Sequence, residues 1–273
     1  MQFGYCLNLN FLLNHDPRGE EIFAGVLAAG YDYVETQLTN LLSLPAAKYE
    51  GFKRRLAEAG VPCRAGMMIF PYGMPLVSDE RDLRAITEHA GRVMPIAADL
   101  GCELLVFGHG GTRRVPEGMT REATRRRLIE VLRILDELTA DLGIKLAIEP
   151  LCAQDTDFIN SLPEALEVAR ACGANTGALF DLYHAAAEGQ PPADIALAGD
   201  RLFHLHIANP NGRTVPADSD DNGCYRAFAG AVRQCGYNGR MSVEAGIPDG
   251  ADAARAVAGA LRIARQYFAE GSV

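Results

Sequence analysis

The chain has 273 residues, of which 48% are hydrophobic and 22% are charged, so it is long enough to bury a large core. Its 35 acidic residues outnumber its 26 basic residues, which gives a formal net charge of −9. Because proteins that hold a phosphate backbone usually carry a basic excess, this balance disfavours nucleic acid as a partner.

Eight short apolar runs with the character of strands recur along the chain at intervals of about 25 to 40 residues. In chain order they cover residues 3–9, 31–36, 63–70, 103–108, 145–151, 176–183, 201–208 and 240–245. Helical periodicity fills the gaps between them. Strands that are apolar along nearly their whole length are typical of a parallel sheet covered by helices.

Two of the helices can be placed from their ends as well as from their periodicity. The clearest is predicted over residues 121–142, with Thr120 as its N-cap and Gly143 just past its last turn. Another is predicted to start at Ser161, because Ser161 and Glu164 have the spacing of a capping box.

Eight strand and helix units in roughly 250 residues predict an α/β protein with a single (β/α)8 TIM barrel. We expect residues 1–273 to form this barrel as one domain. A doubly wound open sheet is the alternative fold, but no Gly-x-Gly-x-x-Gly motif follows the first predicted strand.

The seven cysteines form no Cys-x-x-Cys pair and no zinc-ribbon spacing, so we expect them to be reduced thiols in the core. The first residues lack the basic start and apolar run of a signal peptide, and no apolar run approaches ~18 residues. These features predict a cytoplasmic protein without a membrane partner.

Polar side chains interrupt the last four predicted strands. Glu149, Asp181 and Glu244 lie near the ends of apolar runs, and His204 and His206, two residues apart, point to the same side of another run. A buried carboxylate without a partner is very costly, so three of them gathered with a histidine need a cation or a shared proton. Because the active site of a barrel lies at the C-terminal ends of its strands, we predict a metal site there.

Plainer interpretations apply to several of these residues taken singly. A glutamate after a strand, such as Glu149, is more often a helix cap or an ion-paired residue than a metal ligand. We expect His204 to be a satisfied interior histidine one layer below His206. For His109, within Gly-His-Gly-Gly, a structural role in the loop and a contact with substrate are both open. The metal site is favoured because four consecutive strands each end in a side chain that can bind a metal.

Four motifs together resemble a known superfamily. They are Ile148-Glu149-Pro150, Phe180-Asp181-Leu-Tyr-His184, His204-Leu-His206-Ile-Ala and Ser242-Val-Glu244-Ala-Gly. This combination resembles the xylose-isomerase-like barrels, which are sugar isomerases and epimerases and include tagatose 3-epimerase, hydroxypyruvate isomerase and inosose dehydratase. The resemblance covers nearly the whole chain.

The resemblance implies one divalent metal ion, with Glu149, Asp181, His206 and Glu244 as its ligands. Three carboxylates and one imidazole suit Mn²⁺ or Mg²⁺ first, with Co²⁺ or Zn²⁺ as alternatives. The resemblance also implies that His184 and Arg213 contact substrate oxygens.

By the same resemblance, Glu149 and Glu244 form an acid/base pair. A metal that draws charge from a carbonyl acidifies the adjacent C–H, and the two carboxylates would remove and return that proton through an enediolate. The expected activity is therefore that of a metal-dependent sugar isomerase or epimerase acting on a ketose or a related polyol.

The sequence departs from the pattern of ketohexose epimerases in two loops. After Glu149, the usual asparagine-arginine stretch and second glutamate are missing, and Asp155 is the residue that could take the glutamate's place. After Arg213, the usual Pro-Gly-x-Gly is also missing, and the chain has no tryptophan.

The loops after the seventh and eighth predicted strands, where barrels usually bind phosphate, carry Asp218, Asp220, Asp221 and Asp249 against Arg213 alone. This balance predicts an unphosphorylated substrate, although Arg113 and Arg114 after the fourth strand could oppose it. The main alternative is a keto-polyol dehydratase. Less favoured are a phosphodiesterase like the AP endonucleases, for which the six histidines are too few, and a non-catalytic sugar-binding barrel. A homo-oligomer, either a dimer or a tetramer, is compatible with the sequence.

Overall fold

The computed structural model describes residues 1–14, 16–217 and 223–269, so His15, Asp218, Asp220 and Asp221 lie outside the described residues. The eight strands are β1 Gln2–Leu7, β2 Tyr33–Gln37, β3 Cys63–Met67, β4 Leu104–Phe107, β5 Lys145–Ile148, β6 Thr176–Asp181, β7 Leu202–Ile207 and β8 Arg240–Val243. They pair in parallel in chain order, and β8 pairs with β1 to close the barrel. The predicted barrel is confirmed, and the open-sheet alternative is excluded.

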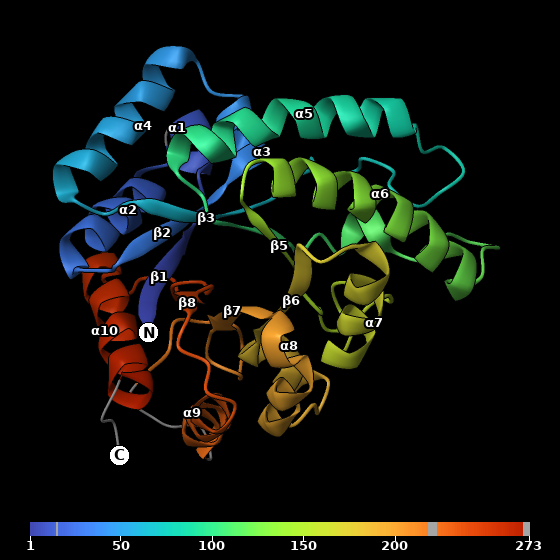
Figure 1. The fold of residues 1–273 in the computed structure, drawn as a ribbon. Coiled ribbons are helices and arrows are strands. Elements are labelled where there is room, and N and C mark those ends of the chain that lie inside the picture. The colour runs from blue at the N-terminus through green and yellow to red at the C-terminus, as the bar shows by residue number, and fades with distance from the viewer. Residues whose placement is uncertain (15, 218–222, 270–273) are drawn as a thin grey trace.

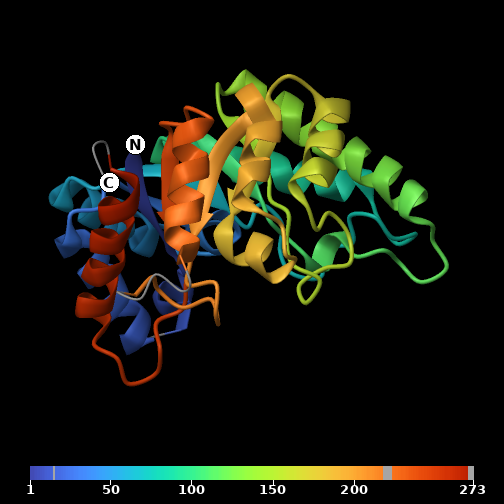
Figure 2. The ribbon, with the colours of Figure 1, turned by 90° about the horizontal axis from the view of Figure 1, so that it is seen from below.

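Helices surround the strands (Figure 1). They are α1 Asn10–Asn14, α2 Pro17–Ala29, α3 Leu38–Leu42, α4 Ala46–Ala59, α5 Leu83–Leu100, α6 Arg121–Asp141, α7 Leu162–Cys172, α8 Leu182–Ala187, α9 Cys224–Gln234 and α10 Ala253–Phe268, with 3₁₀ helices at Gly111–Arg113 and Pro192–Arg201. The last helix, α10, packs against α2 and so completes the ring (Figure 1). The loops after β7 and β8 lie at the end of the barrel opposite the N-terminus (Figure 2).

The two helix starts predicted from the sequence are confirmed. The Thr120 side chain accepts a hydrogen bond from the Ala123 amide at the start of α6, and Ser161 accepts one from the Glu164 amide at the start of α7. Glu164 differs from the usual capping box, since its carboxylate accepts from the amide of Asn160 at 2.7 Å, one residue before the cap.

Hydrophobic residues pack in two separate clusters. The larger lies between the barrel and its helices. The smaller consists of residues from β2 to β6 that face the barrel axis, namely Tyr33, Ala65, Leu104, Val106, Ala147 and Leu179. This inner cluster fills part of the barrel, so polar groups that share the interior lie out of contact with water.

All seven cysteines are free. Cys63, Cys102 and Cys152 are buried as expected for core thiols, whereas the other four are only partly buried. None of the helices in the described part of the chain combines the length and the apolar composition needed to span a lipid bilayer.

Candidate metal and active site

Four side chains meet where β5 to β8 end. Asp181 is the last residue of β6 and His206 lies in β7, while Glu149 and Glu244 directly follow β5 and β8. His206 Nδ1 lies 3.1 Å from Glu149 Oε1, 3.4 Å from Glu244 Oε2 and 3.7 Å from Asp181 Oδ2. One imidazole nitrogen therefore faces three carboxylates, and these are the four residues that the sequence predicted as metal ligands.

The two carboxylate oxygens of Asp181 have different surroundings. Its Oδ1 accepts the amide of His184 at 2.9 Å and so caps α8. Its Oδ2 is buried and has no hydrogen-bond partner among the described residues, although it lies beside His206 Nδ1. A buried carboxylate oxygen left in this way is what a cation would satisfy, so the residues present fit a divalent ion.

His184 lies in the same cluster as Glu149, Asp181 and Glu244. Its Nδ1 accepts the amide of Cys152 at 3.1 Å, so the neutral ring carries its proton on Nε2. That Nε2 is buried without a partner among the described residues. His184 can therefore donate a hydrogen bond through Nε2, and its contact with a substrate oxygen stays a prediction.

Arg213 connects two acidic residues at the barrel mouth. Its guanidinium donates to Glu244 Oε2 at 2.8 Å and to Asp155 Oδ2 at 3.5 Å, and it lies over the Tyr183 ring. The backbone of Arg213 has φ 53°, and its carbonyl accepts the amide of Gly246 from the loop after β8. These contacts hold the arginine beside the carboxylates, and they bring Asp155 to the site as well.

The two glutamates differ in their electrostatic surroundings. Burial and the negative charge of Glu244 raise the pKa of Glu149. Burial alone would raise the pKa of Glu244 too, but Arg213 and His206 outweigh it and hold that pKa well below its usual range. Burial likewise tends to lower the pKa of His206, whereas Glu35, Cys6 and Glu149 raise it by more. A bound cation would add its own positive charge to this balance.

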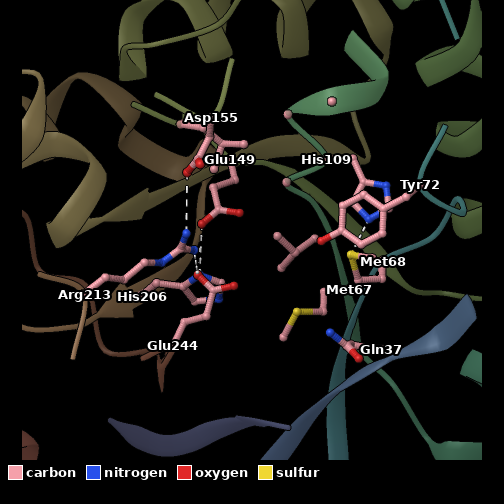
Figure 3. Close-up of a pocket in the computed structure, with 15 residues that line it drawn as sticks. Gln37, Met67, Met68, Tyr72, His109, Glu149, Asp155, His206, Arg213 and Glu244 are labelled. Carbon is pink, nitrogen blue, oxygen red and sulfur yellow. Dashed lines mark hydrogen bonds and ion pairs between the residues drawn. The ribbon is translucent and has the colours of Figure 1, made fainter. Parts of the chain in front are cut away.

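A cavity of about 260 Å³ opens above the carboxylates. Figure 3 shows its two walls, with Glu149, Arg213 and Glu244 on one side and Met68, Tyr72 and His109 on the other. A second hollow lies next to it, and the two share Gln37, Met67, Arg213 and Glu244 as lining residues.

His109 supports the cavity wall, and its contact with substrate stays a prediction. Its ring stacks on Tyr72 with the centroids 5.4 Å apart, and its Nε2 contacts Met68 Sδ, so it supports the cavity wall. Burial and the charge of Arg113 lower the pKa of His109 to about 4, so the ring is neutral near pH 7. It also lines the cavity, where a substrate could reach it.

The neighbouring arginines belong to the scaffold. Arg113 is fully buried and donates to the carbonyls of Glu149 at 2.7 Å and Ile159 at 3.4 Å. Arg114 donates to the carbonyls of Gln154 and Asp155. Both guanidinium groups therefore hold the loop after β5 against the end of β4.

Gly108 makes room for the carboxylate of Glu149. A Cβ atom at this position would overlap Glu149 Oε2. The absence of a side chain at Gly108 lets β4 pass close to the glutamate and is a requirement of the site.

Glu35, Met68 and Tyr72 also lie at the site, although they were not predicted from the sequence. Glu35 is a fully buried carboxylate in β2 that contacts both His204 and His206. The sequence did contain a sign of Glu35, because this residue interrupts an apolar run in the same way as Glu149, Asp181 and Glu244 do. Tyr72 and Met68 follow β3 and had no such signal, since aromatic and sulfur-containing residues also occur in ordinary loops.

A closed parallel barrel with a histidine and three carboxylates at its C-terminal mouth defines a class of α/β barrel suited to binding a metal. The family model of the xylose isomerase-like TIM barrel matches residues 23–266, and the chain belongs to this family. No curated protein sequence matches the chain significantly.

Solved structures share the fold at low sequence identity. A D-psicose 3-epimerase solved in the presence of D-fructose is 18% identical, with a TM-score of 0.82 over 98% of this chain and 99% of that one. A D-allulose 3-epimerase from Methylomonas sp., in complex with D-allulose, is 21% identical, with a TM-score of 0.80 over 98% and 97%. An AP endonuclease, family 2, from Brucella melitensis is also 21% identical, with a TM-score of 0.74 over 93% and 97%.

Proposed function

We propose that the protein is a divalent-metal-dependent sugar epimerase or isomerase that acts on a ketose or a related polyol. The observation that carries the proposal is His206 Nδ1 facing the carboxylates of Glu149, Asp181 and Glu244, with one buried Asp181 oxygen lacking a partner among the described residues. The similarity in fold to epimerases of psicose and allulose supports it.

Glu149, Asp181, His206 and Glu244 would hold the ion. When bound, it would supply the positive charge that polarises a substrate carbonyl and acidifies the neighbouring C–H. Mn²⁺ or Mg²⁺ suits this oxygen-rich set best.

In this proposal Glu149 and Glu244 move the proton. One carboxylate takes it from the carbon beside the carbonyl, and a carboxylate returns it to the enediolate, either to the opposite face or to the neighbouring carbon. The Nε2–H of His184 and the guanidinium of Arg213 contact the substrate oxygens on which negative charge develops. Arg213 also keeps Glu244 ionised, as a proton acceptor must be.

The proton transfer can be tested by isotope exchange. Incubation with the right ketose in D₂O should place deuterium at the carbon beside the carbonyl, because a carboxylate exchanges its proton with water unless the site is fully closed. Mass spectrometry and NMR of the recovered substrate and product would show the label.

Each competing activity has its own outcome in the same experiment. Complete retention of the original hydrogen at a transferred position would indicate a hydride shift and remove Glu149 and Glu244 as bases. A product lighter by one water would indicate a dehydratase. Untouched sugars together with nicking of abasic DNA would indicate a nuclease, and binding without conversion would indicate a sugar-binding barrel.

We further propose that the substrate is unphosphorylated. Arg113 and Arg114 are engaged by backbone carbonyls, and Arg213 is engaged by Glu244 and Asp155. A phosphate group would have to displace these contacts and lie beside carboxylates. We expect kcat/KM for the free sugar to exceed that for its phosphate, and a much higher value for the phosphate would contradict the assignment.

A further inference from the structure

A layer of polar side chains lies inside the barrel beside the proposed metal ligands. Glu35, His204 and Ser242 are each fully buried in it. Glu35 Oε2 accepts the Ser242 hydroxyl at 2.7 Å and lies 2.9 Å from His204 Nε2. The Tyr33 hydroxyl lies 2.9 Å from Ser242 Oγ and extends the network. Such a carboxylate is held in one place by several donors at once.

The same carboxylate also reaches His206. Glu35 Oε2 lies 3.2 Å and Oε1 lies 3.3 Å from His206 Nε2, on the side of the ring away from the metal-binding carboxylates. Among the described residues, Nε2 also lies 3.9 Å from Cys6 Sγ, and a thiol is a weak acceptor. Glu35 is therefore the strong hydrogen-bond acceptor for this nitrogen.

The two nitrogens of the His206 ring thus have different partners, with Glu35 beside Nε2 and the three proposed metal ligands beside Nδ1. A neutral imidazole carries one N–H and one lone pair, and the hydrogen bond at one nitrogen decides which nitrogen keeps the proton. An ionised carboxylate can only accept, so Glu35 holds the proton on Nε2. A cation bound among Glu149, Asp181 and Glu244 would exclude a proton from Nδ1, so the lone pair of that nitrogen would then be directed at the cation.

We propose that Glu35 is a positioning residue that orients His206 and sets its tautomer for metal binding through Nδ1. The inference rests on the metal site of the proposed function. The proposed ligands all lie on or just after β5 to β8, whereas Glu35 lies on β2. Closure of the barrel brings Glu35 into contact with His206, 171 residues away in sequence. Partners of this kind commonly tune the affinity of metal-binding histidines.

The tautomer can be measured on the wild-type protein. With ¹⁵N-labelled histidine and Zn²⁺ as a diamagnetic probe, long-range ¹H–¹⁵N NMR should show His206 protonated at Nε2, and the His206→Asn variant would identify its signals. A proton on Nδ1 with Zn²⁺ bound would overturn the proposal. This measurement decides the question even where a substitution at Glu35 prevents folding.

The affinity for metal gives a second test. In Glu35→Gln, calorimetric titration with Mn²⁺ should show binding weakened by about 10- to 100-fold, the range typical of a lost partner of a metal-binding histidine. Tyr33→Phe is the matched control, because it removes a hydroxyl that contacts Ser242 in the same buried network and leaves the hydrogen bonds of Glu35 in place, so its Mn²⁺ affinity should stay near wild type. Circular dichroism would confirm that each variant folds.

The outcomes separate the two proposals. Wild-type protein that binds no Mn²⁺ would contradict the metal site itself and the role of Glu35 with it. Tight binding by the wild type and equally tight binding by Glu35→Gln would contradict only the role of Glu35. An equal loss of affinity in Tyr33→Phe and Glu35→Gln would show that the buried network acts through general stability, which also overturns the positioning role.

Discussion

Replacing Glu149 or Glu244 by glutamine should lower turnover by at least ~10²-fold, the scale of a lost general base. Glutamine keeps the shape of the side chain but cannot take up a proton. Because the amide also binds a cation less well, metal content must be measured beside kcat. Steady-state kinetics at saturating Mn²⁺, with elemental analysis of each variant, would separate the two effects.

Glu58→Gln is a suitable control for both variants. Glu58 lies on α4 with its side chain 69% exposed, paired with Arg54 at 3.9 Å, where an ion pair contributes little. Its turnover should equal that of the wild type. Full activity in either Glu149→Gln or Glu244→Gln would remove that residue from the acid/base pair.

Removing the metal should abolish activity, and Mn²⁺, Mg²⁺ or Co²⁺ should restore it. Without a cation, Glu149, Asp181 and Glu244 repel one another in a partly buried cluster, and their positive partners are His206 and Arg213. Dialysis against a chelator, followed by assay and elemental analysis, should give one ion per active chain.

The same ion should raise the thermal midpoint of unfolding, because a ligand that binds only the folded state stabilises it. Asp181→Asn, which removes one proposed ligand, should show a smaller rise and serves as the control. An active protein that contains no metal, or one that contains three zinc ions, would contradict the proposal.

The sequence by itself determined the barrel and the four residues at its mouth. Strands and helices follow from local periodicity, and the C-terminal ends of parallel strands in a closed barrel must lie together. Once eight strands were identified, Glu149, Asp181, His206 and Glu244 had to approach one another, so their meeting needed no knowledge of side-chain packing.

Only the tertiary structure decided which other polar groups serve the site. Arg113 and Arg114 are positively charged and follow the fourth strand, so the sequence alone left them as possible ligands of a phosphate. In the structure their guanidinium groups donate hydrogen bonds to carbonyls of the loop after β5. In the sequence, Glu35 is one acidic residue in an apolar strand. Its contact with His206 forms across the barrel, between β2 and β7, and so depends on the tertiary structure. Charge and strand position are local properties, whereas the partner of a buried charge is set by chain segments far apart in sequence.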